Sequence, residues 1–320
     1  MPITEVLMAN IMEFHEIDLH SGQITKPRWS PDGRFLAIPM QSGSIAIFDL
    51  NLNQVVQTVG GHSAQVTAVG WNREAQFIMT GSLDRSVGVW EVKGGRRTGV
   101  IISGHKEPVH SVEWTDEGAY AMTCSADRVR ALDGFCLEAG WTRQMEDGIN
   151  MYKGFTAASC SFRTTLLLGL AAKNGALLVL TSLLNAQALD HVRMQQPVRS
   201  LAWSPMEDTL TVASGQSIFA FRATQEGFKR PVRELTRNAP YVDALAFSGD
   251  GTLLVSRDAH GLKVWDVKAG RLIATLEENI ETPSSRRPAS GIALHPARPL
   301  VAAVTLNGTA LRLLDLSKLV

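Results

Sequence analysis

Short apolar segments separated by turn residues recur along the whole chain. Residues 35–38 and 77–80 are apolar runs, and each is followed by a second apolar run, at residues 45–48 and 87–90. Apolar runs of this length that are bounded by turn residues predict β-strands. The nearest approach to a helical pattern is residues 183–196, but this segment lies where the repeat described below requires an outer strand. The pattern therefore predicts an all-β fold.

Two landmarks show that the strands belong to a repeating unit. A large apolar residue ends the first strand of each unit and recurs at intervals of 41 to 48 residues, and a second ends the third strand 18 to 20 residues later. The first landmarks are Trp29, Trp71, Trp114, Phe162, Trp203, Phe247 and Leu294. The second landmarks are Phe48, Trp90, Leu132, Leu180, Phe221, Trp265 and Leu314. Because both landmarks keep step over seven copies, the sequence predicts a repeat architecture.

Dipeptides at fixed positions of the repeat resemble those of a known family. The second copy has Gly61-His62 and Trp90-Glu91, the third has Gly104-His105, and the sixth has Trp265-Asp266. A period of about 40–45 residues with a Gly-His and Trp-Asp signature is typical of the WD-repeat family. The resemblance implies a seven-bladed β-propeller of four-stranded antiparallel blades, with residues 1–320 as a single domain. In this family each repeat is offset from its blade.

The ends of the chain are expected to close the ring. The last copy ends at its third strand, so it lacks an outer strand, and only residues 317–320 follow. Near the other end, residues 12–19 alternate apolar with polar side chains. We therefore expect a strand within residues 11–20 to pair with the last blade and close the ring.

The second copy holds four polar or aromatic residues that the resemblance assigns to a structural tetrad. These residues are His62, Thr80, Asp84 and Trp90. A hydroxyl, an imidazole and a carboxylate could also form a hydrolase triad. The resemblance favours a structural role over a catalytic one, because members of the family use this spacing for a buried hydrogen-bond network. The third copy has a partial set, His105, Thr123 and Asp127, with Leu132 in the position of the tryptophan.

Composition narrows the function further. The chain has 31 Lys and Arg against 31 Asp and Glu, so its formal charge is zero, which argues against general nucleic-acid binding. The start of the chain has no pattern of a signal peptide, and no apolar stretch reaches the length of a membrane-spanning helix. Three cysteines imply no disulfide framework, which favours the cytoplasm. No motif indicates a catalytic residue, a cofactor, a metal or a small-molecule substrate.

The candidate partner-binding residues lie in two long connectors and near the starts of the first strands. The connectors before residues 157 and 289 exceed the others by three to seven residues, and they contain Trp141 and the pair Arg286 and Arg287. Exposed Trp and Arg are enriched at interface hot spots. The residues expected to ring the channel are Gln23, Gln65, His110, Arg199, Tyr241 and Asp243. An arginine pair could also bind a phosphorylated or acidic motif.

The sequence thus favours a non-catalytic scaffold that docks a partner peptide or domain on one face of the ring. Loops on a rigid framework are common binding surfaces. One alternative is a sensor or regulatory module of a bacterial signalling or defence system. The other is a propeller enzyme with its active site at the channel mouth, because a fold alone does not fix a function.

Overall fold

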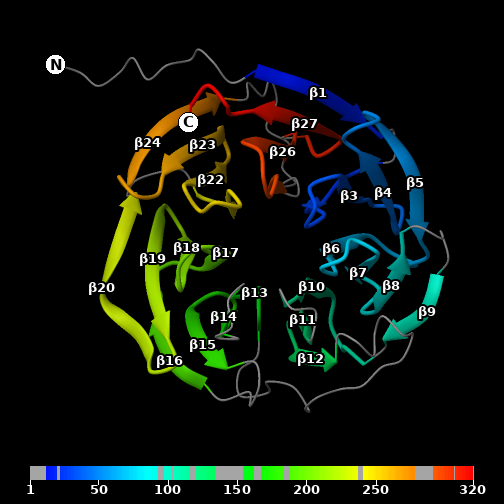
Figure 1. The fold of residues 1–320 in the computed structure, drawn as a ribbon. Coiled ribbons are helices and arrows are strands. Elements are labelled where there is room, and N and C mark those ends of the chain that lie inside the picture. Colours follow the sequence, from blue (N-terminus) through cyan, green and yellow to red (C-terminus); the bar gives the residue numbers. More distant parts are fainter. Residues whose placement is uncertain are drawn as a thin grey trace.

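The structure is a computed structural model in which seven antiparallel sheets surround a central channel (Figure 1). It describes residues 12–19, 22–92, 97–102, 104–115, 120–133, 154–161, 167–182, 188–236, 241–277, 291–305 and 307–319. In each sheet the first strand lies at the channel and the last strand lies at the rim (Figure 1). The predicted seven-bladed β-propeller is confirmed.

Blades 1 to 4 follow one another along the chain. Blade 1 contains β2 (Arg28–Trp29), β3 (Phe35–Pro39), β4 (Ser44–Asp49) and β5 (Gln54–Gly60). Blade 2 contains β6 (Val66–Trp71), β7 (Phe77–Ser82), β8 (Val87–Glu91) and β9 (Arg97–Ile102). Blade 3 has three strands among the described residues, β10 (Val109–Trp114), β11 (Tyr120–Ser125) and β12 (Val129–Asp133). Blade 4 contains β13 (Ala157–Cys160), β14 (Leu167–Ala172), β15 (Leu177–Ser182) and β16 (Ala188–Arg193).

Blades 5 to 7 complete the ring. Blade 5 contains β17 (Val198–Trp203), β18 (Thr209–Ser214), β19 (Ser217–Thr224) and β20 (Gly227–Thr236). Blade 6 contains β21 (Ala244–Phe247), β22 (Leu253–Asp258), β23 (Gly261–Asp266) and β24 (Arg271–Glu277). Blade 7 contains β25 (Ile292–Leu294), β26 (Leu300–Val304), β27 (Ala310–Asp315) and β1 (Met12–Asp18). The segment with the helix-like pattern therefore contains the outer strand β16, as expected.

The N-terminal strand closes the ring, as the sequence predicts. In blade 7 the strand order is β1-β27-β26-β25, so β1 is the outermost strand of a sheet otherwise built from the end of the chain. The pairing is antiparallel and places Ile17 opposite Leu311. Ile17 is buried in a cluster that also holds residues of blade 1, such as Leu36 and Phe48. Closure therefore brings blade 7 against blade 1 as well as completing its sheet.

The fourth copy departs from the expected landmark positions. Phe162 lies outside the described residues, and β13 already ends at Cys160. In blades 2 and 5 the landmark tryptophan donates its indole N–H to the residue before the landmark of the preceding blade: Trp71 to the Arg28 carbonyl and Trp203 to the Ser159 carbonyl. By that rule Cys160 holds the landmark position of blade 4. Because cysteine is small, the sequence has no large apolar residue at this position, and Phe162 was chosen as the landmark instead.

Adjacent blades are joined by hydrogen bonds around the channel. Trp29 donates its indole N–H to the Ala293 carbonyl of blade 7 at 3.3 Å. A threonine near the start of a first strand donates to the next blade in three places: Thr25 to the Val66 carbonyl, Thr67 to the Val109 carbonyl, and Thr156 to the Val198 carbonyl. These bonds satisfy polar groups in the interior, and they fix the rotation of each blade against its neighbour.

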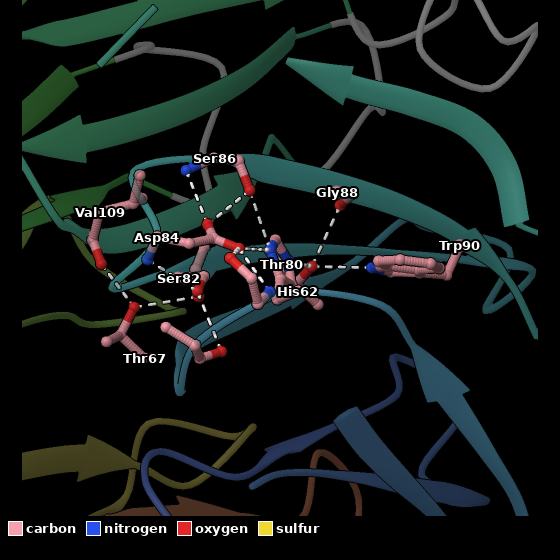
Figure 2. A network of polar contacts seen from close by, with 12 residues as sticks. His62, Thr67, Thr80, Ser82, Asp84, Ser86, Gly88, Trp90 and Val109 are labelled. Carbon is pink, nitrogen blue, oxygen red and sulfur yellow. Dashed lines mark hydrogen bonds and ion pairs between the residues drawn. The ribbon is translucent and has the colours of Figure 1, made fainter. Parts of the chain in front are cut away.

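A buried polar network stabilises blade 2 (Figure 2). The Thr80 hydroxyl lies 2.8 Å from His62 Nε2 and accepts the Trp90 indole N–H at 2.7 Å. His62 Nδ1 lies 3.1 Å from Asp84 Oδ2, which also accepts the Ser63 backbone N–H at 2.9 Å. A His62 tautomer protonated at Nδ1 satisfies every one of these groups. Burial would raise the pKa of Asp84, but hydrogen bonds from Ser86 and Ser63 and the proximity of His62 lower it to about 2.

The network of blade 3 is a reduced version of the same arrangement. His105 Nε2 lies 2.9 Å from the Thr123 hydroxyl, and His105 Nδ1 lies 3.4 Å from Asp127 Oδ1. Leu132 is buried at the position of Trp90 and offers no N–H to the threonine. Burial lowers the pKa of His105 to about 4, although the nearby Asp127 carboxylate opposes the shift.

Removing the closing strand tests the ring. Deleting residues 1–20 is expected to lower the free energy of unfolding by about 3 kcal/mol or more, because Ile17 loses its burial and β27 loses its partner. Urea denaturation measures this change. Deleting residues 1–11 leaves β1 intact and serves as the control. An unchanged free energy of unfolding after the longer deletion would contradict closure by β1.

The two networks predict different costs for the same substitution. Thr80→Val removes the hydroxyl that pairs with His62 Nε2 and with the Trp90 indole N–H, and it is expected to cost about 2–6 kcal/mol of stability, at about 1–3 kcal/mol for each buried group. Thr123→Val removes only the partner of His105 Nε2 and is expected to cost about half as much. Chemical denaturation of both variants gives the comparison. Equal costs would show that the indole does not depend on the Thr80 hydroxyl.

The lowered pKa of His105 predicts acid sensitivity. Below pH 6.5 the unfolded chain binds a proton at this residue, whereas the folded chain does so only near pH 4. Stability should therefore fall as the pH is lowered through this window, by about 1.4 kcal/mol per pH unit and about 3 kcal/mol in all. His105→Asn should flatten this dependence in denaturation curves recorded between pH 7 and pH 4. The same substitution at exposed His191 is the control, and an equal flattening there would refute the assignment.

Candidate functional site

The first strands line a central channel with a cavity of about 120 Å³. Position along a first strand gives depth, because all of these strands start at one face of the ring, which we call the first-strand face. Nearest that face lie His110, Arg199 and Asp243, four residues before their landmarks. The next level holds Lys26 and its equivalents, three residues before their landmarks. The deepest level holds Arg28 and Glu113, one residue before their landmarks. The channel therefore has three levels, and each of them carries charged or titratable side chains.

The mouth of the channel holds an ion pair under an exposed aromatic ring. Arg199 Nη1 lies 2.9 Å from Asp243 Oδ1, and the Arg199 guanidinium lies 5.4 Å from the centre of the Tyr241 ring. Tyr241 is 42% exposed. The structure thus brings three of the sequence-predicted residues together, at the junction of blades 5 and 6. A planar guanidinium held by a carboxylate and a ring forms a rigid surface.

The other predicted residues near the first-strand face belong to blades 1, 2 and 3. His110 lines the channel, where burial and the positive charge of Lys26 lower its pKa against the effect of Glu107. Gln65 accepts the Leu83 backbone N–H through its own carbonyl at 3.0 Å. Gln23 receives a hydrogen bond from Gln41 in the same way, at 2.9 Å. The backbones of the two glutamines thus stabilise turns at this face.

A deep carboxylate connects blades 3 and 4. Glu113 Oε2 accepts the Cys160 backbone N–H at 2.6 Å, and Glu113 Oε1 accepts the Ser159 hydroxyl at 3.4 Å. Arg28 Nη1 lies 4.0 Å from the same carboxylate. Burial raises the pKa of Glu113, while Arg28 and these hydrogen bonds oppose the shift. Glu113 could not be predicted from the sequence, because a lone glutamate in a strand carries no signal of its place in a ring.

A groove of about 670 Å³ opens between blades 4 and 5 on the first-strand face. Its apolar lining comes from the end of β16 and from β19, and Tyr241 belongs to the lining as well. The apolar residues are Val192, Met194, Phe219, Phe221 and Tyr241. Nearer the opposite face the two outer strands meet, where the Phe228 backbone N–H donates to Asp190 at 3.0 Å. The groove was not predicted, because it depends on how two outer strands diverge.

Trp141, Arg286 and Arg287, with most of the two long connectors, lie outside the described residues. Their role as docking residues stays a prediction.

The tetrad residues lie away from the channel and the groove. Thr80 is fully buried, and none of the four residues lines either cavity. No group of three or more His, Cys, Asp or Glu within the described ranges is arranged to hold a metal ion. Nor does any described segment form a helix that could cross a membrane.

Sequence comparisons match parts of the chain to WD-repeat proteins. Residues 8–74 match the family model of the anaphase-promoting complex subunit 4 WD40 domain, and residues 96–129 match the WD domain, G-beta repeat. The 66 kDa stress protein of Physarum polycephalum is 38% identical over 74 residues, which are 23% of this chain and 12% of that protein. COMPASS component SWD3 of Saccharomyces cerevisiae is 32% identical over 76 residues, which are 24% of each chain. The matches thus span a quarter or less of these curated relatives.

The structural comparison covers nearly the whole chain. The Cps50 (Swd1) β-propeller domain of Myceliophteria thermophila superimposes with a TM-score of 0.80 at 18% identity, covering 96% of this chain and 100% of that one. At this identity the likeness establishes the fold. The matched repeats, over residues 8–74 and 96–129, and the closed ring of blades support the resemblance to the WD-repeat β-propeller family that the landmark residues indicate.

Proposed function

We propose that this protein is a non-catalytic scaffold that docks a protein or peptide partner on the first-strand face of the ring. The observation that carries the proposal is Tyr241, which belongs to the groove and also covers Arg199 at the channel mouth. A partner lying in the groove would therefore meet the channel without leaving the surface. Aromatic and arginine side chains of this kind are the usual anchors of protein interfaces.

The chemistry of the groove suits a peptide. Phe219 and Phe221 give it apolar area, while Arg193 and Glu234 place charges of both signs on its polar lining. An apolar floor with a polar rim is the common anatomy of a binding surface. A nucleic-acid backbone would instead require a row of cations. General nucleic-acid binding is therefore not part of the proposal.

The relatives support a role in assemblies. One relative is a cofactor of the APC complex, the cell division cycle 20.1 protein of Arabidopsis thaliana, which is 32% identical over 73 residues, or 22% of this chain and 16% of that protein. SWD3 is named as a COMPASS component. We infer for this chain the general role of a complex component, as a single propeller domain over residues 1–320 in the cytoplasm, and we leave the partner open.

Substitutions on the two faces of blades 5 and 6 test the proposal. Tyr241→Ala is expected to weaken partner binding about tenfold or more, because it removes a central aromatic anchor. Met206→Ala is the matched control, since Met206 is also exposed but lies in the turn after β17, at the opposite face. Affinity capture from the source cells, followed by titration of the captured partner, measures both. Equal loss with the two variants would contradict docking on the first-strand face.

The second long connector can be tested in the same assay. Arg286→Glu/Arg287→Glu is expected to reduce capture if the second long connector takes part. Unchanged partners and yields would remove this connector from the docking surface, while the prediction for Tyr241 would stand.

A further inference from the structure

Lys26 is an exception among the side chains at the middle level of the channel. The other first strands place small residues three positions before the landmark, among them Ala68, Ser111, Ser200 and Ala244. These small side chains leave room in front of the lysine. Blade 1 therefore points a long cation into a space that the other blades leave open.

The channel has more cations than carboxylates. Among its described lining residues, Lys26, Arg28 and Arg199 are cationic, and Glu113 and Asp243 are acidic. Asp243 is paired with Arg199 at 2.9 Å. Glu113 faces Arg28 at 4.0 Å. One positive charge is thus in excess, in a chain whose total formal charge is zero.

The surroundings of Lys26 make this excess charge costly. Lys26 is exposed and lines the channel cavity. Desolvation lowers the pKa of Lys26, although Cys124 and Glu113 favour its charged form. An added anion beside Lys26 would favour its charged form and so oppose the effect of desolvation.

We propose that the channel receives an anionic side chain, a carboxylate or a phosphorylated residue, from a partner docked on the first-strand face, with Lys26 as its counter-ion. The proposal rests on the proposed docking function. A cavity of about 120 Å³ has room for one side chain and not for a folded segment. Such a side chain would pass His110 and Arg199 before it reached Lys26, and both of these residues can donate hydrogen bonds to an anion.

Peptide pools with one fixed central residue test this site. Pools of random peptides carrying aspartate, glutamate, phosphoserine, alanine or lysine at the centre would be passed over the immobilised protein. We expect about tenfold more retention of the acidic pools than of the alanine pool, and loss of this preference in Lys26→Met. Lys229→Met is the control, because Lys229 is an exposed lysine paired with Glu226 at the rim of blade 5. Retention of the aspartate and glutamate pools as well as the phosphoserine pool shows that a carboxylate suffices. Retention of the phosphoserine pool alone identifies a phosphorylated partner.

Other outcomes would overturn the proposal, and they separate it from the docking function. The protein could retain all pools equally, whatever their central residue, and lose them with Tyr241→Ala. That result would support the docking proposal and contradict the anion site. No retention of any pool, or an acidic preference that persists in Lys26→Met, would also remove it. A measurement on the unmodified protein guards against a variant that fails to fold: inorganic phosphate should raise the pKa of the Lys26 ammonium followed by NMR. An unmoved pKa would contradict the proposal.

Discussion

The pairing of β1 with β27 is the constraint on which the rest of the structure depends. Each blade has two apolar faces and buries them only against neighbours on both sides. A ring that stayed open would expose one face of blade 1 and one face of blade 7. Because the closing strand comes from the N-terminal part of the chain, the last sheet is complete only when β1 pairs with β27. Closure therefore converts seven marginal sheets into one body.

Closure also explains why the blades are joined where they are. The threonine and tryptophan bonds lie around the channel, where the first strands converge. On the opposite face His295 donates to the Gly33 carbonyl at 2.9 Å, which joins the turns of blades 7 and 1. Gly33 has a φ of 72°, and a Cβ there would lie 2.3 Å from the His295 ring, so only glycine fits. These bonds give the first-strand face a fixed geometry, which a docking surface requires.

Much of the fold could be predicted from the sequence because the landmarks report burial. Trp71 and Trp90, both predicted as landmarks, are buried in the cluster that packs blade 2 against blade 1. The fourth copy was displaced because Cys160 is too small to mark its position. At the site, Arg199, Tyr241 and Asp243 were each predicted to lie near the channel. The contacts among them were not predicted, because they depend on the rotation between blades 5 and 6. Lys26 was missed because a lysine near a strand start normally indicates solvent.

The zero net charge has a more local meaning in the folded ring. It argues against binding of polyanions over a wide surface, yet the channel concentrates one unbalanced cation at its centre. Under the proposed function, the protein would show no general affinity for nucleic acid and would still prefer one acidic side chain of its partner. Selectivity then depends on access through the mouth rather than on the total charge.

Hydrogen exchange on the complex with a captured partner tests the central claim most directly. If the partner docks on the first-strand face, protection should appear in residues 194–199, 215–219 and 241–245, which include the groove and the channel mouth. The turns at the opposite face, residues 31–34 and 204–208, should exchange as they do in the free protein. Protection confined to those turns would contradict the account.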